Sequence, residues 1–199
     1  VRARVGDAIV LTTYGRSSGF VLDPIEKKPL AHVLPGSTIL SFGTAGCNLA
    51  CKYCPNWGIS TSRQFETLAA PAAPRALAAT AADVGAAGVA FTYNDPIVFA
   101  EYAIDTAVAC HEAGLLAVAV SGGWISPGPC DELFGTVDAA NIDLKGFTDD
   151  FYRRVTGGRL NDVLDTLVRV RELGTWLEIT TLLIPGRNDS DAEIAAECH

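Results

Sequence analysis

The chain has 199 residues, of which 49% are hydrophobic and 19% charged, a balance typical of a globular domain with a substantial core. Its formal net charge of −8 argues against a nucleic-acid backbone as the main partner, because such binding depends on clustered Lys and Arg. No long apolar segment or signal peptide is visible, so we expect a cytoplasmic protein that binds neither nucleic acid nor membrane. The chain lacks Met and ends in a helix-like run without a stop signal, so we also expect a fragment.

Two β-prone runs open the chain, at residues 8–15 and 19–23, and the turn-forming sequence GRSSG separates them. Apolar strands and helices then alternate. We expect strands at 38–44, 88–93, 115–123, 138–146 and 175–186. We expect helices at 74–88, 96–114, 131–137 and 160–174, and a further helix that begins near Ser190. Strands that are almost continuously apolar indicate a parallel sheet covered on both faces.

This repetition predicts an α/β fold, either part of a (β/α) barrel or a doubly wound sheet. A full eight-unit barrel needs about 250 residues, so a chain of this length holds only part of one. We expect a β-rich lead-in over residues 1–36 and a partial barrel over 37–199 that is truncated at its C-terminal end. In either architecture, chemistry gathers at the carboxyl ends of the strands.

Half of the cysteines follow the first of the five strands, in the sequence TAGCNLACKYCPNW: Cys47, Cys51 and Cys54. A structural zinc site needs four ligands and would have to recruit a residue such as His32. Disulfides cannot pair three clustered thiols and are rare in a reducing cytosol. A [4Fe–4S] cluster on three thiolates would leave one iron open to a cofactor or substrate. Zinc and a purely structural loop remain the alternatives.

The spacing C-x3-C-x2-C, with Tyr53 before the last cysteine, is identified as the signature of the radical SAM superfamily. The sequence LSFGTAGCNLACKYCPNWGIS resembles the AmmeMemoRadiSam group, whose radical SAM enzymes are similar to pyruvate formate-lyase activating enzymes. The resemblance continues through FTYNDP, NIDLKGFTDDFYRRVTGG and LEITTLLIPGRND. It implies a partial (β/α)6 TIM-like barrel of the radical SAM type, of which five units are readable here.

The resemblance implies an enzyme that holds a [4Fe–4S] cluster on the three cysteines and binds S-adenosylmethionine (SAM) at the open iron. Reductive cleavage of SAM would give a 5′-deoxyadenosyl radical that abstracts a hydrogen atom from an unknown small-molecule or protein substrate. The electron donor would be a flavodoxin or ferredoxin. A glycyl-radical-enzyme activase shares these cofactor residues and is a second reading. A non-enzymatic zinc or iron–sulfur module is a third.

The resemblance also implies where SAM binds. Tyr53 is expected near the adenine, and Asn94 and Asp95 are expected where the SAM amino group binds. Because Asp95 precedes Pro96, we also expect it to cap the helix at 96–114.

Two further strand ends are expected at the SAM site. The first carries Ser121, Gly122 and Gly123, where glycine lets the backbone approach a ligand closely. The second carries Asp143 and Lys145, which alternation places on one face of their strand. The resemblance assigns the ribose to Asp143 and the SAM carboxylate to Lys145, and a mutual ion pair is the alternative.

Other polar residues carry weaker expectations. Three residues on or after the last predicted strand are expected to point into the barrel: Glu178, Thr180 and Arg187. Two lysines of the lead-in are expected in solvent: Lys27 and Lys28. Cys110 is expected in the core, and no role follows for Cys130 or Cys198.

Overall fold

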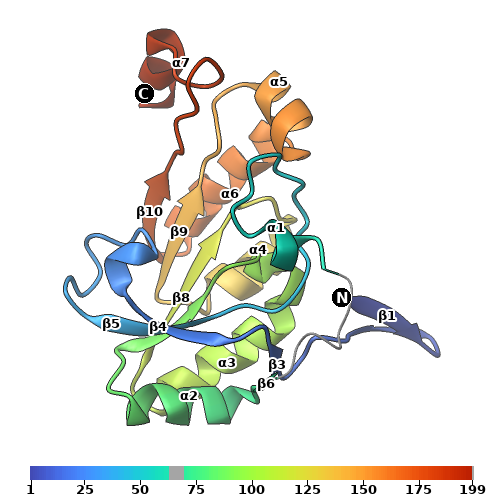
Figure 1. Cartoon of the computed structure of the whole chain (residues 1–199), viewed down its shortest axis with the longest axis vertical. Helices are drawn as coiled ribbons and strands as arrows, with labels where there is room; N and C mark the ends of the chain where they lie inside the picture. Colours follow the sequence, from blue (N-terminus) through green and yellow to red (C-terminus); the bar gives the residue numbers. More distant parts are fainter. Residues whose placement is uncertain (63–69, 199) are drawn as a thin grey trace.

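The computed structural model describes residues 1–62 and 70–198, and a six-stranded sheet lies at its centre (Figure 1). In spatial order its strands are β10 (Trp176–Thr180), β9 (Ala139–Asp143), β8 (Leu116–Ser121), β7 (Gly88–Phe91), β5 (Thr38–Phe42) and β4 (Phe20–Pro24). Neighbouring strands from β5 to β10 are parallel, and β4 is antiparallel to β5. The prediction of five barrel strands in an α/β fold is confirmed. In the described residues the sheet is open, with β10 and β4 as its edges.

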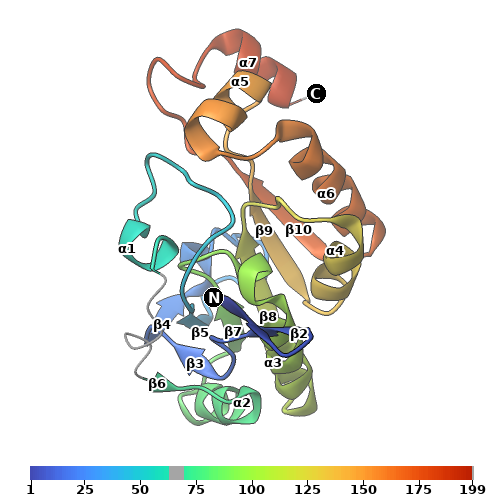
Figure 2. The same cartoon turned by 90° about the vertical axis from the view of Figure 1, so that its right-hand side faces the viewer.

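The main helices cover one face of this sheet (Figure 2). They are α2 (Pro74–Asp83), α3 (Ala100–Glu112), α4 (Pro127–Phe134) and α6 (Leu160–Glu172), and α7 (Asp191–Glu197) lies beyond β10. The shorter helical segments are η1 (Ile25–Lys27), α1 (Trp57–Ser60), η3 (Pro96–Phe99), α5 (Asp149–Phe151) and η4 (Tyr152–Thr156). Each predicted helix is present, and Ser190 caps α7 as expected. The predicted start of α4 at residue 131 is wrong. The helix begins at Pro127, because proline is favoured in the first turn of a helix.

The core between the sheet and the helices is built around aromatic side chains. Phe42 contacts Phe91 edge to face, with ring centroids 5.8 Å apart, and it also contacts Phe99 and Tyr102. All four side chains are fully buried. Burying one such side chain stabilises the fold by roughly 1.5–3 kcal/mol, so this cluster anchors α3 to the sheet.

The lead-in covers part of the other face of the sheet. Ile25 and Leu30 are fully buried there, in one cluster with Ile39, Ala90 and Val118 of the strands. The carbonyl of Pro29 accepts a hydrogen bond from Asn141 on β9. Since β4 also pairs with β5, the lead-in is part of the same sheet and core. The division of the chain at residue 36 stays a prediction.

The expectation that both lysines of the lead-in lie in solvent is wrong for one of them. Lys27 is exposed, but Lys28 is only 2% exposed. Its ammonium lies 2.7 Å from the carboxylate of Asp23, which is itself buried on β4. A buried carboxylate needs a cation or hydrogen-bond donors, and Lys28 supplies both.

The lead-in also contributes strands to two small antiparallel sheets. One is the hairpin of β1 (Arg2–Val5) and β2 (Ala8–Leu11), which projects from the body of the molecule (Figure 1). The other pairs β3 (Arg16–Ser17) with β6 (Ala70–Pro71). Within the described part of the chain, no helix is long and apolar enough to cross a membrane.

Candidate functional site

The three clustered cysteines lie in one loop that leaves the carboxyl end of β5 and leads into α1 (Figure 2). All three thiols are free and half-buried. Backbone hydrogen bonds hold both ends of the loop, from Gly46 to the carbonyl of Ile59 at 3.0 Å and within the turn from Cys54 to Cys51. The motif therefore occupies the edge of the sheet at which the sequence predicts the chemistry.

The middle of the cysteine loop is bound to η4, a π-helical turn after β9. The amides of Ala50 and Lys52 donate to the carbonyls of Thr156 and Val155, at 2.7 and 3.0 Å. Two glycines follow this turn and leave room for the loop. A Cβ on Gly158 would lie 2.8 Å from the side chain of Leu49. This contact was not predicted, although the sequence TGG at residues 156–158 is the signal that marks it.

The thiols are close enough to affect one another's ionisation. Burial raises the pKa of Cys51 to about 11, with further contributions from Cys47, Cys54 and Asp143, while Lys145 opposes the shift. Burial also raises the pKa of Cys47, and nearby Asp95 adds to this shift. Such mutual repulsion between thiolates is what a bound cationic metal group relieves.

The donor set consists of three thiols, the ligand type that iron–sulfur clusters use. Among the described residues, no group of three or more His, Cys, Asp or Glu side chains could hold one metal ion. A [4Fe–4S] cluster is larger, and each thiolate binds a different iron atom, so its ligands need not meet at one point. Three thiols on a well-held loop therefore suit a cluster with one iron left open.

Asn94, which follows β7, is tied to the start of the cysteine loop. Its side chain accepts a hydrogen bond from the amide of Thr44 at 2.8 Å and donates to the carbonyl of Gly46 at 2.8 Å. The two loops pack closely, because a Cβ on Gly43 would lie 2.4 Å from the carbonyl oxygen of Thr92. The buried amide of Asn94 thus fixes the position of one loop relative to the other.

Asp95 connects the loop after β7 with the loop after β8. Its carboxylate accepts hydrogen bonds from the amide of Ile97 at 3.2 Å, the hydroxyl of Ser121 at 2.8 Å and the amide of Gly122 at 2.8 Å. The bond from Ile97 confirms the predicted helix cap. Only 6% of Asp95 is exposed, and burial raises the pKa of its carboxyl group. Its main observed contacts are therefore to the protein itself.

The SGG sequence after β8 requires its glycines. A Cβ on Gly122 would lie 2.6 Å from Leu49 and 3.3 Å from both Asp95 and Lys145. Gly123 has a φ of +69°, a conformation that other residues adopt only with strain. This loop lies among the cysteine loop, the loop after β7 and the end of β9.

Asp143 and Lys145 form an ion pair at the end of β9. Lys145 is 8% exposed, and although burial alone would lower its pKa, Asp143, the Cys51 thiol and Asp95 raise it. The mutual pair that we weighed as an alternative is therefore present. The charges of Lys145, Cys51 and Asp95 therefore influence one another's ionisation.

Tyr53 lies between the cysteine loop and the segment after β9. Its ring packs against Phe151, with centroids 6.5 Å apart. Its hydroxyl is buried and makes no hydrogen bond within the described residues, and burial raises its pKa. A buried hydroxyl without a partner is costly, so Tyr53 is an unsatisfied donor in the described part of the chain.

The structure places the three other predicted polar residues on or after β10, two of them with hydrogen-bond partners of their own. The carboxylate of Glu178 accepts the amides of Ala31 and His32 in the lead-in, at 2.8 and 3.0 Å. Thr180 donates to Asn141, and Arg187 is exposed. After β10 the buried residue is instead Asn188, which donates to the carbonyl of Lys145 at 3.0 Å.

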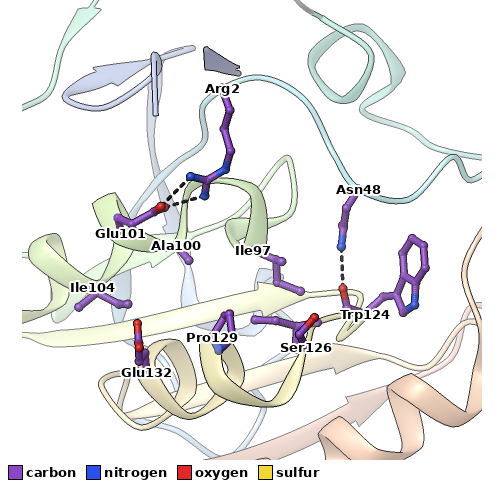
Figure 3. A pocket seen from close by; sticks show the side chains of 11 residues that line it. Arg2, Asn48, Ile97, Ala100, Glu101, Ile104, Trp124, Ser126, Pro129 and Glu132 are labelled. Atoms are coloured by element: carbon purple, nitrogen blue, oxygen red, sulfur yellow. Dashed lines mark hydrogen bonds and ion pairs between the residues drawn. The ribbon is translucent and has the colours of Figure 1, made fainter. Parts of the chain in front are cut away.

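A pocket of about 330 Å³ lies beside the cysteine loop, between η3, α3 and α4 (Figure 3). The side chain of Asn48 reaches across it to the carbonyl of Trp124 at 2.6 Å. At the other side, Arg2 makes two hydrogen bonds with Glu101. The first contact connects the cysteine loop with the loop after β8, and the second connects β1 with α3.

Comparison with known sequences identifies one family. The family described as the radical SAM superfamily matches residues 42–198. An uncharacterized protein of Methanocaldococcus jannaschii (MJ0808) is 35% identical over 189 residues, which is 95% of this chain and 56% of that protein. A pyruvate formate-lyase-activating enzyme of Clostridium pasteurianum is 27% identical over 154 residues, which is 75% of this chain and 63% of the enzyme. The chain thus spans less than two thirds of the length of either relative.

Solved structures share the fold at low sequence identity. Streptococcus suis SuiB bound to S-adenosylmethionine has a TM-score of 0.60 and 13% identity, over 77% of this chain and 35% of that one. A domain of a pyruvate-formate lyase-activating enzyme from Bacteroides vulgatus has a TM-score of 0.51 and 22% identity, over 55% of this chain and 68% of that one. These similarities confirm the partial-barrel fold.

Proposed function

The chain belongs to the radical SAM superfamily, whose enzymes use a [4Fe–4S] cluster and SAM, and from this premise we propose that it cleaves SAM reductively to begin a hydrogen abstraction. The observation that carries the proposal is the set of three free, half-buried thiols on one loop at the carboxyl ends of the strands. Cys47, Cys51 and Cys54 would each bind one iron atom. When bound, the cluster supplies the electron that breaks the sulfonium S–C5′ bond and so forms the 5′-deoxyadenosyl radical.

The buried charges around the thiols support this assignment. Lys145 lies close enough to Cys51 to lower its pKa, so its ammonium offsets the negative charge of the bound thiolates. We assign the SAM carboxylate to Lys145 and the ribose to Asp143, which would exchange part of their mutual ion pair for the ligand. The ammonium of Lys145 is already buried, so it loses little solvation when the ligand carboxylate arrives.

The remaining contacts with SAM are assigned to three neighbouring loops. The side chains of Asn94 and Asp95 already hydrogen-bond to neighbouring loops. They would therefore position the loop, and its backbone would bind the SAM amino group. Ser121, Gly122 and Gly123 would let the backbone approach the ligand closely. Tyr53 would lie beside the adenine, with its unpaired hydroxyl as a donor.

A second candidate function is activation of a glycyl radical enzyme. It is favoured by the similarity to the pyruvate formate-lyase-activating enzyme of Clostridium pasteurianum. The substrate would then be a glycine in the backbone of a partner protein. In both versions we propose a cytoplasmic enzyme that takes its electron from a reduced flavodoxin or ferredoxin, in keeping with six free cysteines.

The experiment that tests the proposal is anaerobic reconstitution of the full chain with iron and sulfide, followed by SAM and dithionite. We expect bound iron and the formation of 5′-deoxyadenosine. Cys51→Ser should abolish both, while Cys198→Ser, at an exposed cysteine outside the loop, should retain both. Zinc without iron in the purified protein, or no 5′-deoxyadenosine from the loaded wild type, would contradict the proposal.

The activase candidate needs a further measurement. The loaded protein is mixed with pyruvate formate-lyase, and the sample is examined by EPR for a glycyl radical. A glycyl radical that depends on SAM supports the second candidate. Formation of 5′-deoxyadenosine without any glycyl radical supports a different substrate for the same chemistry.

A further inference from the structure

Tyr93 has an unusual backbone conformation for its residue type. It follows β7 and has a φ of +70°, in the left-handed region that residues with a Cβ adopt only with strain. Such strain persists only where surrounding contacts hold it, and it gathers at functional sites. The residue directly precedes Asn94 and Asp95, so its conformation decides where those two side chains point.

The contacts that hold Tyr93 come from the lead-in. Its hydroxyl donates to the carboxylate of Asp23 at 3.0 Å, and the ammonium of Lys28 lies 4.9 Å from the centre of its ring. Asp23 is 3% exposed and Lys28 is 2% exposed. Burial would raise the pKa of Asp23, but hydrogen bonds from Lys27, Lys28 and Tyr93 hold it below its ordinary range. The phenol therefore donates to a buried, ionised carboxylate, which makes a strong hydrogen bond.

Three successive residues thus connect this loop with three different parts of the fold. Tyr93 reaches β4, Asn94 reaches the cysteine loop, and Asp95 reaches the loop after β8. The last two contacts lie within the proposed SAM site. The contact of Tyr93 lies outside that site, in the lead-in. Neither the cysteine motif nor the proposed SAM contacts involve the lead-in.

We propose that Tyr93 is a positioning residue for SAM: through its hydrogen bond to Asp23, the lead-in holds the loop after β7 in the conformation that binds the cofactor. This inference rests on the proposed function. Without the hydrogen bond, the loop would relax toward an unstrained backbone, and the side chains of Asn94 and Asp95 would move away from their partners. SAM binding would then have to restore the strained conformation and would weaken accordingly.

The test is Tyr93→Phe in the full chain, which keeps the ring over Lys28 and removes only the donor. The first readout needs neither cluster nor SAM. The amides of Thr44 and Gly122, which donate to Asn94 and Asp95, should exchange with solvent about tenfold faster. The amide of Ala117, which donates to the distant carboxylate of Asp138 at 2.8 Å, should not change.

The second readout uses the reconstituted protein. The Michaelis constant for SAM should rise about tenfold, while the rate of 5′-deoxyadenosine formation at saturating SAM stays within about twofold of wild type. The matched control is Tyr14→Phe, because Tyr14 is an exposed phenol that also donates to a carboxylate, that of Asp105. It should leave both readouts unchanged.

Two results would overturn the inference. One is unchanged exchange at Thr44 and Gly122 in the Tyr93→Phe variant. The other is a fall in the saturated rate without a change in the Michaelis constant, which would give Tyr93 a part in the reaction rather than in binding. If the wild type forms no 5′-deoxyadenosine, the proposed function fails, and the exchange rates still decide whether Tyr93 holds the loop.

Discussion

The amide of Ala50 donates a 2.7 Å hydrogen bond to the carbonyl of Thr156, and this contact fastens the cysteine loop to the segment after β9. The two residues are 106 positions apart in the chain, yet they determine how the three thiols are presented. The partner carbonyl belongs to a π-helical turn, a local geometry that is frequent at functional sites. The loop is therefore held by the body of the fold before any metal binds.

Gly43→Ala is expected to separate the cysteine loop from the loop after β7. The new Cβ would lie 2.4 Å from the carbonyl oxygen of Thr92 and 2.7 Å from the side chain of Asn94, so backbone has to move. We expect a loss of about 1–3 kcal/mol in the free energy of unfolding, measured with urea. Gly128→Ala is the control, because it lies in α4 with open space around it and should stabilise slightly. Equal stabilities of the two variants would contradict the close packing of the loops.

In the cluster-free protein, alkylation of Cys51 should report its raised pKa. Since the thiolate is the reactive form, the rate should rise with pH until about 11. Lys145 lowers this pKa, so Lys145→Met should raise it and slow the reaction at pH 9 several-fold. Lys52→Met, at an exposed neighbour of Cys51, is the control and should react like the wild type. Mass spectrometry after iodoacetamide gives the rates, and a faster reaction in Lys145→Met would refute the assigned contact.

Glu178→Gln is expected to loosen the lead-in in a way that depends on pH. Burial would raise the pKa of Glu178, but hydrogen bonds from the amides of Ala31 and His32 hold it below its ordinary range. A lowered pKa in the folded state stabilises above the unfolded value of about 4.3, and this contribution is lost as pH falls. The free energy of unfolding of the variant should therefore be about 1–2 kcal/mol lower than that of wild type at pH 7. This difference should become smaller when the pH falls below about 4.

The control for this experiment is Glu112→Gln, at an exposed residue whose ion pair with Arg75 is also exposed. It should change the free energy of unfolding by less than about 0.5 kcal/mol at either pH. A gap between wild type and Glu178→Gln that widens as pH falls would reverse the predicted sign and exclude the assigned hydrogen bonds.

Asn188→Ala is expected to destabilise the loop after β10. The side chain is 1% exposed, donates to the carbonyls of Lys145 and Leu182, and accepts from the amide of Ile184. Its removal leaves three backbone groups without partners and should cost about 2–3 kcal/mol in urea denaturation. Asn161→Ala, at an exposed position of α6, should cost less than about 0.5 kcal/mol. Similar losses for the two variants would argue against this network.

Much of the scaffold follows from local patterns. The five barrel strands are short apolar runs, and the helices between them carry their own start signals, such as Asp95 before Pro96 and Ser190 before α7. These signals act within a few residues, so a single sequence reveals them. The start of α4 is harder to predict, because the sequence SPGPC is rich in Pro and Gly, although Pro127 is suited to the first turn of a helix.

The candidate site was predictable to the extent that its residues stand in a motif. The spacing of Cys47, Cys51 and Cys54 indicated a cluster with an open iron, and the strand ends indicated which loops face it. The partners of these residues were not predictable. Nothing near Glu178 in the sequence indicates that its carboxylate binds the amides of residues 31 and 32, and nothing near Arg187 indicates that Asn188 is the buried residue.

The sequence by itself determined the strand and helix order, the cysteine motif and the family, because periodicity, caps and ligand spacing are local properties of the chain. The tertiary structure alone decided that Lys28 is buried, that Tyr93 adopts a left-handed conformation, and that η4 holds the cysteine loop. Each of these depends on groups far apart in sequence, such as Asp23 and Tyr93, which are 70 residues apart. A buried charge or a strained backbone is stable only when a partner from another part of the fold stabilises it, and no local pattern encodes that partner.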